Sequence, residues 1–189
     1  MVILNSINQM QNEMQEWRRD LHKMPEIGLE EYKTSAYIKK KLKSWNIEFR
    51  DGYSNTGIVA WIKGNKGDGK KSIGIRADFD ALPMPEKNNF DHKSSEDGMM
   101  HACGHDGHTS MLLGAAKYLK ENSDFDGVVY FIFQPGEEGF SGGKKMIDDG
   151  MFKDFDIDEV YALHNWPELP LGSFGVNSGP MMAAVDEFD

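Results

Sequence analysis

The feature that most constrains the fold is residues 128–133, the longest uninterrupted run of apolar or aromatic side chains in the chain. The run is far too short to cross a bilayer as a helix. Its valines, isoleucine and aromatic residues are typical of a strand that is buried on both faces, as strands are when helices cover both sides of a sheet. The run therefore predicts a central strand in a sheet covered by helices.

Helical and extended patterns alternate along the rest of the chain. Apolar spacings of three and four residues, or a glycine stop, predict helices over residues 3–23, 30–45, 109–121 and 144–149. Residues rich in β-formers predict strands over 57–63, 72–79 and 159–164, with a further candidate at 171–176 and a hairpin-type turn at 64–71. This alternation predicts an α/β layered domain with a largely parallel, mixed central sheet flanked by helices.

Composition excludes several classes of partner and compartment. Lys and Arg number 21 against 31 Asp and Glu, a formal net charge of -10, which argues against nucleic acid or an anionic membrane as the partner. The single cysteine, Cys103, cannot form an internal disulfide, which fits a reducing cytoplasm and leaves the thiol free for chemistry. Residues 1–15 lack a basic segment followed by an apolar run. We therefore expect a cytoplasmic protein without a secretory signal.

Residues 100–108 concentrate metal-binding side chains. They hold Cys103 and three of the six histidines, and one glycine separates Cys103 from His105. A bend at that glycine would turn both side chains toward one point, where thiolate and imidazole together suit zinc and similar divalent metals. The same residues would also suit a glycine-rich turn with a buried thiol and solvated histidines.

Other chemical side chains fall where predicted strands end. Asp78 and Asp80 close the strand at 72–79, Glu137 and Glu138 follow the run at 128–133, and His164 closes 159–164. In parallel sheets such groups gather at the carboxyl ends of strands. The convergence predicts a shared cleft.

Each of these residues also has a structural interpretation. Paired glutamates are usually a solvated turn, a lone His164 is often packed or exposed, and Asp78 and Asp80 could pair with Arg76 or cap a turn. The remaining histidines, His22, His92, His101 and His108, are treated as structural or solvated.

Adjacent glutamates have a specific chemical use. One carboxylate can bind a metal while its neighbour takes a proton from the metal-activated water and later delivers it to a leaving amine. Four ligands of mixed hardness are available in Cys103, His105, Glu138 and His164. Asp80 could fix the orientation of a metal ligand by hydrogen-bonding to it, without binding the metal itself.

Five motifs, in this order, resemble the metal-dependent N-acyl-L-amino-acid amidohydrolases. That family includes hippurate hydrolase, the aminoacylases and the plant auxin-conjugate hydrolases, and it is related to the zinc carboxypeptidases. The resemblance covers nearly the whole chain. The motifs are Arg19-Asp20-Leu21-His22 with Pro25-Glu26, residues 76–83, residues 101–108, residues 134–139 and His164-Asn165.

The resemblance implies a site with two divalent metal ions that hydrolyses the amide of an N-acyl amino acid. The motif positions of Cys103, His105, Glu138 and His164 match the family's metal ligands, with Cys103 or His105 placed between the metals. The catalytic residues it implies are Glu137, which matches the general base, and Asp80, which matches an aspartate behind the metals. Zinc or manganese is favoured, and nickel or cobalt is compatible. Gly136 stands where the family commonly has alanine.

The chain is shorter than members of the family. They carry an inserted lid and dimerisation domain after the segment matching residues 179–189, then return to the catalytic domain, which supplies one more metal-binding histidine. Residues 1–189 are therefore expected to be the N-terminal part of the catalytic domain, weak or inactive alone, with longer relatives forming homodimers or larger assemblies through the missing domain. Apolar residues near the end, namely Phe174, Val176, Met181, Met182 and Phe188, are then expected to be exposed.

Two other functions remain open at this point. A dipeptidase or carboxypeptidase of the same fold would use the same groups, and a non-catalytic protein could keep the metal site without turnover. The sequence leaves open the acyl group, the amino acid and the native metal.

Overall fold

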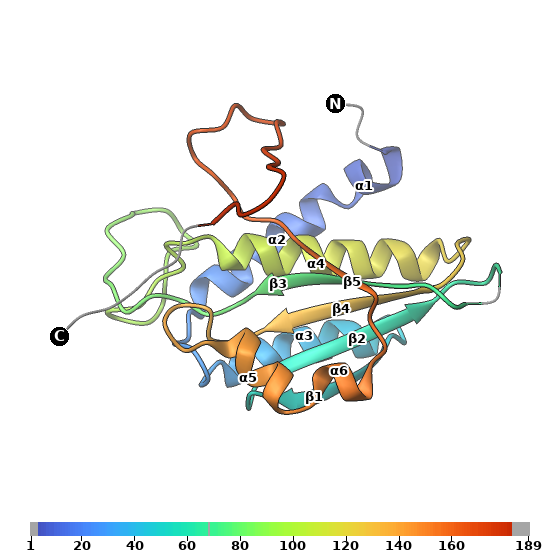
Figure 1. Ribbon diagram of the computed structural model, residues 1–189. Helices are drawn as coiled ribbons and strands as arrows, with labels where there is room; N and C mark the ends of the chain where they lie inside the picture. Colours follow the sequence, from blue (N-terminus) through green and yellow to red (C-terminus); the bar gives the residue numbers. More distant parts are fainter. Residues whose placement is uncertain (1–3, 68, 183–189) are drawn as a thin grey trace.

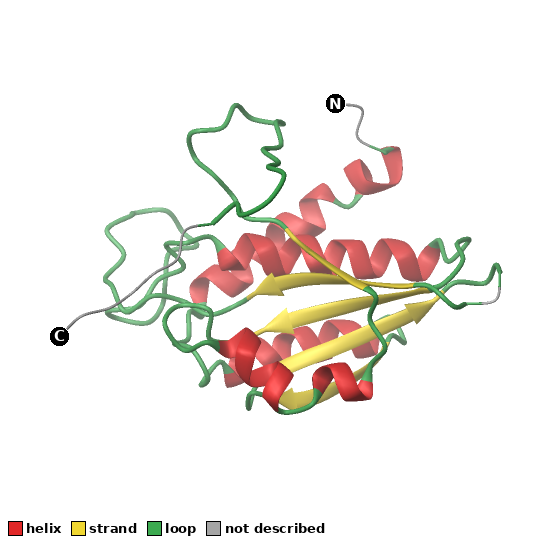
Figure 2. Ribbon diagram, in the orientation of Figure 1, coloured by secondary structure: helices red, strands yellow, loops and turns green. Residues whose placement is uncertain are grey.

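The computed structural model describes residues 4–67 and 69–182, which form a five-stranded sheet with helices on both faces (Figures 1 and 2). The order of strands across the sheet is β1-β2-β4-β3-β5. The strands are β1 (Glu48–Tyr53), β2 (Gly57–Lys63), β3 (Ser72–Asp78), β4 (Val128–Gln134) and β5 (Glu159–Ala162).

The sheet is mixed, as expected. β1 pairs antiparallel with β2 and β2 with β4, whereas β3 runs parallel to both β4 and β5. The apolar run forms β4, which lies between β2 and β3, so the prediction of a central strand is confirmed. Phe131 and Phe133 point to one face and Ile132 to the other, and all three are buried.

Helices cover the two faces unequally (Figure 1). The larger core joins the sheet to α2, α3 and α4 through Trp17, Ile38 and Leu113, and the smaller core on the opposite face joins it to α5 and α6 through Met146 and Met151. The helices are α1 (Asn5–Gln9), α2 (Gln11–Lys23), α3 (Tyr32–Ser44), α4 (His105–Glu121), α5 (Gly142–Asp148) and α6 (Met151–Asp154).

Several elements differ from the sequence-based expectation. The helix expected over 3–23 is interrupted at Met10, whose N–H bonds to the Ile7 carbonyl three residues back. Residues 64–71 are not a hairpin turn, because β4 lies between β2 and β3 and the segment must cross over it. The strand considered at 171–176 is absent, since Gly172 turns the chain at φ +80° and Leu171 and Val176 are fully open to solvent. β1 and α6 had not been predicted.

The segment after β5 carries exposed apolar side chains. Phe174, Val176, Met181 and Met182 are exposed, as expected, and Phe188 lies outside the described residues. Among the helices within residues 4–67 and 69–182, none is both long and apolar enough to cross a membrane.

Parallel register places the candidate chemical residues at one edge of the sheet. Asp78 at the end of β3 lies beside Gln134 at the end of β4. After β3 the chain moves away from this edge of the sheet and comes back to it at Met100. There, Leu82 and Met100 exchange two backbone hydrogen bonds of 3.1 Å. This return delivers residues 100–108, the Cys/His stretch, to the same edge, where α4 begins at His105 directly after Gly104.

Candidate metal centre

His105 lies at the centre of the site and its side chain is almost fully buried. Its Nδ1 lies 2.9 Å from the backbone carbonyl of Asp80 and 3.2 Å from the Asp80 carboxylate. A carbonyl only accepts, so Nδ1 carries the hydrogen and Nε2 faces the opposite way. The other Asp80 oxygen accepts the backbone N–H of Glu138 at 2.9 Å. Asp80 therefore orients both His105 and the loop after β4 that carries Glu137 and Glu138, the glutamate loop.

Three carboxylates surround His105 Nε2 without hydrogen-bonding to it. Oxygens of Asp78, Glu137 and Glu138 lie 3.7, 3.9 and 3.8 Å from this nitrogen, which is beyond hydrogen-bond range. Within the described part of the chain, neither His105 Nε2 nor the buried Glu138 Oε1 has a hydrogen-bond partner. Unpaired buried polar atoms are costly, so this arrangement is what a site for a cation would show.

The second group of donors comes from the Cys/His stretch and the end of β5. Cys103 Sγ lies 3.4 Å from His164 Nε2. Donor atoms of Cys103, His105 and His164 all lie within 4.8 Å of one another, and so do those of His105, Glu137 and Glu138. The structure thus brings together, around His105, all four of the residues expected as ligands and the expected general base.

This donor set fits divalent metal ions. It combines a thiol, imidazoles and carboxylates, the mixture that zinc and similar borderline metals accept. His105 Nε2 at the start of α4 and Glu138 Oε1 in the loop after β4 lie 3.8 Å apart, and neither has a hydrogen-bond partner among the described residues.

The site favours positive charge. Burial alone would lower the pKa of His105, but the hydrogen bond with Asp80, the nearby Cys103 and the charge of Asp78 outweigh it and raise that pKa to about 11. Burial, together with the charges of Glu138 and Asp78, raises the pKa of Glu137.

Asp78 and His108 also lie beside His105, but their polar atoms are already engaged. The Asp78 carboxylate accepts from Arg76 at 2.8 Å and bonds to His108 Nδ1 at 2.6 Å. Burial raises the pKa of Asp78, yet His108 and Arg76 bring it down to about 2. The pairing of Asp78 with Arg76, left open by the sequence, is therefore what the structure has, whereas Asp80 serves His105 and Glu138.

A residue that the sequence did not single out anchors the glutamate loop. Glu31, fully buried just before α3, accepts the Gly136 N–H at 2.8 Å and the Thr56 hydroxyl at 2.6 Å. The link between Glu31 and Gly136 spans 105 residues in sequence. No local pattern marks such a contact, although it holds the backbone that leads into Glu137 and Glu138.

The histidines treated as structural fall into different environments. His22 bonds to Asp106 at 2.9 Å and to Glu86 at 3.1 Å, and His92 stacks on Phe90. His101 is buried, with no hydrogen-bond partner for either ring nitrogen among the residues described. His108 bridges Asp78 and Asn165.

The contacts of His22 predict a pH dependence of stability. The Asp106 hydrogen bond, opposed by burial and aided by Glu86, raises the pKa of His22 above its ordinary value of about 6.5. Protonated His22 therefore stabilises the fold fully below about pH 6.5, and this contribution is lost as pH rises through the folded-state pKa. The free energy of unfolding of the parent minus that of His22→Gln should decline with rising pH in urea titrations.

A matched histidine variant provides the control for that experiment. The pKa of His92 is lowered, chiefly by burial, so the same difference measured with His92→Gln should not decline as pH rises. A His22→Gln difference that stays constant across the range would contradict the assigned pKa direction.

Gly104 lets the two ligand-bearing segments approach each other. It has φ +94°, and a Cβ there would lie 2.4 Å from the Asn165 Oδ1. Gly98 has a comparable φ of +79° with nothing within 4 Å of its Cβ position. Gly98→Ala should therefore cost about 1–2 kcal/mol for left-handed backbone alone, and Gly104→Ala should cost more. If the two variants lose the same free energy of unfolding in urea titrations, the close contact with Asn165 does not contribute to the cost at Gly104.

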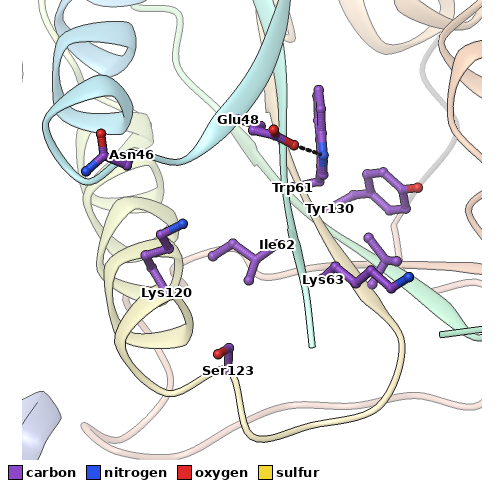
Figure 3. A pocket seen from close by; sticks show the side chains of 9 residues that line it. Asn46, Glu48, Trp61, Ile62, Lys63, Lys120, Ser123 and Tyr130 are labelled. Carbon is purple, nitrogen blue, oxygen red and sulfur yellow. Dashed lines mark hydrogen bonds between the residues drawn. The ribbon is translucent and has the colours of Figure 1, made fainter. Parts of the chain in front are cut away.

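A separate hollow lies at the opposite end of the strands (Figure 3). It opens near Lys63 and Val128, at the amino end of β4, and its one carboxylate, Glu48, accepts a hydrogen bond from Trp61. Its lining lacks the cysteine, histidines and paired glutamates, so it is not a candidate metal centre. The lining residues are Asn46, Glu48, Trp61, Ile62, Lys63, Lys120, Ser123, Val128 and Tyr130.

Comparison with known proteins gives consistent matches. The sequence model of peptidase family M20/M25/M40 matches residues 74–187, more than half of the chain. Hippurate hydrolase of Campylobacter jejuni is 43% identical over 188 residues, covering 100% of this chain and 48% of the relative. N-acetyl-L-cysteine deacetylase of Bacillus subtilis is 48% identical over 172 residues, covering 90% of this chain and 40% of the relative.

A solved structure shows the same architecture. The Bacillus subtilis YXEP protein, described as a dinuclear metal binding peptidase from the M20 family, superposes with a TM-score of 0.85 at 40% identity. The match covers 92% of this chain and 48% of that one. The chain thus spans about half the length of the relatives it matches.

Proposed function

Because this chain belongs to peptidase family M20/M25/M40, we propose that it carries the metal-binding part of an amidohydrolase that cleaves N-acyl amino acids. Both curated relatives hydrolyse the amide of an N-acylated compound by their names, and the solved relative is named as dinuclear. The proposed cofactor is accordingly a pair of divalent metal ions, with zinc or manganese favoured.

One observation carries the proposal: the unpaired His105 Nε2 faces Glu138 on one side and the Cys103–His164 pair on the other. We assign Cys103, His105, Glu138 and His164 as ligands. Because Asp80 engages His105 Nδ1, His105 can offer only one nitrogen. Cys103 would hold a metal through its sulfur, as a thiolate ligand that suits zinc and similar divalent ions.

The proposed chemistry divides between the metals and Glu137. When bound, divalent ions polarise a carbonyl and lower the pKa of water from about 15.7 to about 7. Glu137 lies beside this group with 42% of its side chain exposed, so it can reach water and substrate. It would take a proton from the attacking water and deliver it to the leaving nitrogen as the amide C–N bond breaks. The products are a carboxylic acid and a free amino acid.

The chain covers only 48% of the length of two of its relatives, and this affects the activity that we expect from it. We propose that residues 1–189 form the N-terminal part of a catalytic domain. The lid and the remaining metal ligand would correspond to the half of the relatives that this chain does not match. Orientation of a substrate can be worth about 7–11 kcal/mol of barrier. We therefore expect slow hydrolysis from these residues alone.

The test is a metal-dependent assay. The protein is stripped with a chelator, reloaded with zinc, manganese, cobalt or nickel, and given hippurate, N-acetylmethionine or an unacylated dipeptide. Hydrolysis of an N-acyl amino acid that disappears on stripping and returns on reloading is expected. Preference for the dipeptide would favour a dipeptidase, and metal binding without turnover in a chain extended to the relatives' length would favour a non-catalytic protein. Hydrolysis that survives stripping would contradict the proposal.

A further inference from the structure

Among the residues described, the ring of His164 has one polar contact besides Cys103, and it lies edge-on to the His108 ring with centroids 4.7 Å apart. The Nδ1 of His164 lies 2.8 Å from the backbone carbonyl of Asn165, the next residue. Since a carbonyl only accepts, Nδ1 carries the hydrogen, and Nε2 is left to face Cys103 Sγ at 3.4 Å. His164 is exposed and follows β5, an edge strand that is itself exposed. Burial therefore does little to fix this ring, and the direction of Nε2 depends on where Asn165 and the neighbouring His108 ring lie.

Asn165 is fixed from the side of α4. Its side-chain Oδ1 lies 2.7 Å from His108 Nε2 and accepts a hydrogen bond when that nitrogen carries a hydrogen. Its backbone N–H lies 3.2 Å from the same nitrogen and donates when the nitrogen carries none. The side chain also lies against Gly104, where any Cβ would collide with Oδ1. Asn165 is thus held by one hydrogen bond with His108 in either protonation state of Nε2, and by its close approach to Gly104.

His108 is in turn held rigidly inside the protein. Its side chain is buried, and Nδ1 bonds to Asp78 at 2.6 Å. Arg76 holds the other Asp78 oxygen and also donates to Gln134 at 2.9 Å. A continuous set of hydrogen bonds therefore runs from the ends of β3 and β4, through the first turn of α4, to the residue that orients His164.

We propose that Asn165, locked onto the buried Asp78–His108 pair, is a positioning residue that sets the ring orientation and tautomer of His164 and thereby tunes the metal affinity of the site. The inference rests on the proposed function in one respect, that His164 is a ligand. Outer partners that orient a ligating histidine typically change metal affinity by about 10–100-fold. A purely structural tie between β5 and α4 would instead change stability and leave metal affinity alone.

The first test is a titration of the metal-free chain with cobalt, followed through the thiolate-to-cobalt absorption of Cys103. Asn165→Ala should weaken cobalt binding by about 10–100-fold. The matched control is Thr109→Val. Thr109 follows His108, and its buried hydroxyl donates a hydrogen bond of 3.1 Å to the Asp78 carbonyl, which valine cannot make. This substitution should lower stability and leave affinity nearly unchanged. Unchanged affinity in Asn165→Ala, or equal losses in both variants, would overturn the proposal.

A second measurement needs no metal. Long-range nitrogen–proton NMR of the metal-free chain should show His164 mainly as the Nδ1–H tautomer in the parent and in Thr109→Val, and as a mixture of tautomers in Asn165→Ala. The same tautomer in all three would overturn the proposal. If the parent binds no cobalt, the proposed function fails, and the tautomer measurement still decides whether Asn165 orients His164.

Discussion

Glu137→Gln is expected to keep the metal content of the protein and to lower hydrolysis by about 10²–10⁴-fold, the usual weight of a proton-transfer group. The amide has nearly the shape of the carboxylate but cannot accept a proton from water. Asp80 engages the Glu138 backbone and His105, and neither contact involves the Glu137 side chain, so the donor group should keep its shape. Turnover is measured in a chain extended to the length of the relatives, and metal by elemental analysis.

Glu138→Gln is the matched comparison. The two glutamates are neighbours, but only Glu138 has a buried oxygen without a hydrogen-bond partner in the part of the chain that the structure describes. We expect its substitution to lower metal content as well as turnover. Equal metal loss in both variants, or full turnover in Glu137→Gln, would reject this division of roles.

Cys103→Ser is expected to weaken metal binding by more than the roughly 10–100-fold that loss of an outer partner costs. A cysteine binds metal as a thiolate, which is a strong ligand, whereas a serine hydroxyl stays protonated and binds poorly. The effect should exceed that of Asn165→Ala, which removes only a support of His164. Affinity is compared by competition with a chelator of known strength, because the serine variant lacks the thiolate absorption.

His101→Gln serves as the control from the same stretch. His101 is buried but belongs to none of the donor groups found among the described residues. Its substitution should change stability and leave metal affinity close to that of the parent. If Cys103→Ser binds metal as tightly as His101→Gln does, Cys103 is not a ligand.

Much of the sheet could be predicted because burial leaves a strong pattern. β4 is apolar on both faces since helices cover both sides, and β2 has the predicted bounds. β1 carries Glu48, Arg50 and Asp51 and is mostly exposed at the sheet's edge, so it lacks that pattern. The segment at 64–71 looks like a hairpin turn locally, and only the position of β4 shows that it crosses over.

The candidate site was predictable to the extent that it follows from strand ends. Residues that close β3 and β4 meet because those strands are parallel, and the Cys/His stretch has a recognisable composition. The supporting roles had no such signal. Glu31 stood in no motif, and His108 and Asn165 fell inside motifs without any pattern that marked what they hold, because all three act through contacts with residues distant in sequence.

The most direct test of the account is anomalous X-ray diffraction from crystals of the chain grown with zinc or manganese, recorded on both sides of the metal's absorption edge. Anomalous density is expected within the group formed by Cys103, His105, Glu138 and His164, with two peaks about 3.5–4 Å apart when both positions are filled. The peak nearest His105 should lie on the Nε2 side of the ring, opposite Asp80. Bound metal found only elsewhere, or a site without anomalous density at saturating metal, would contradict it.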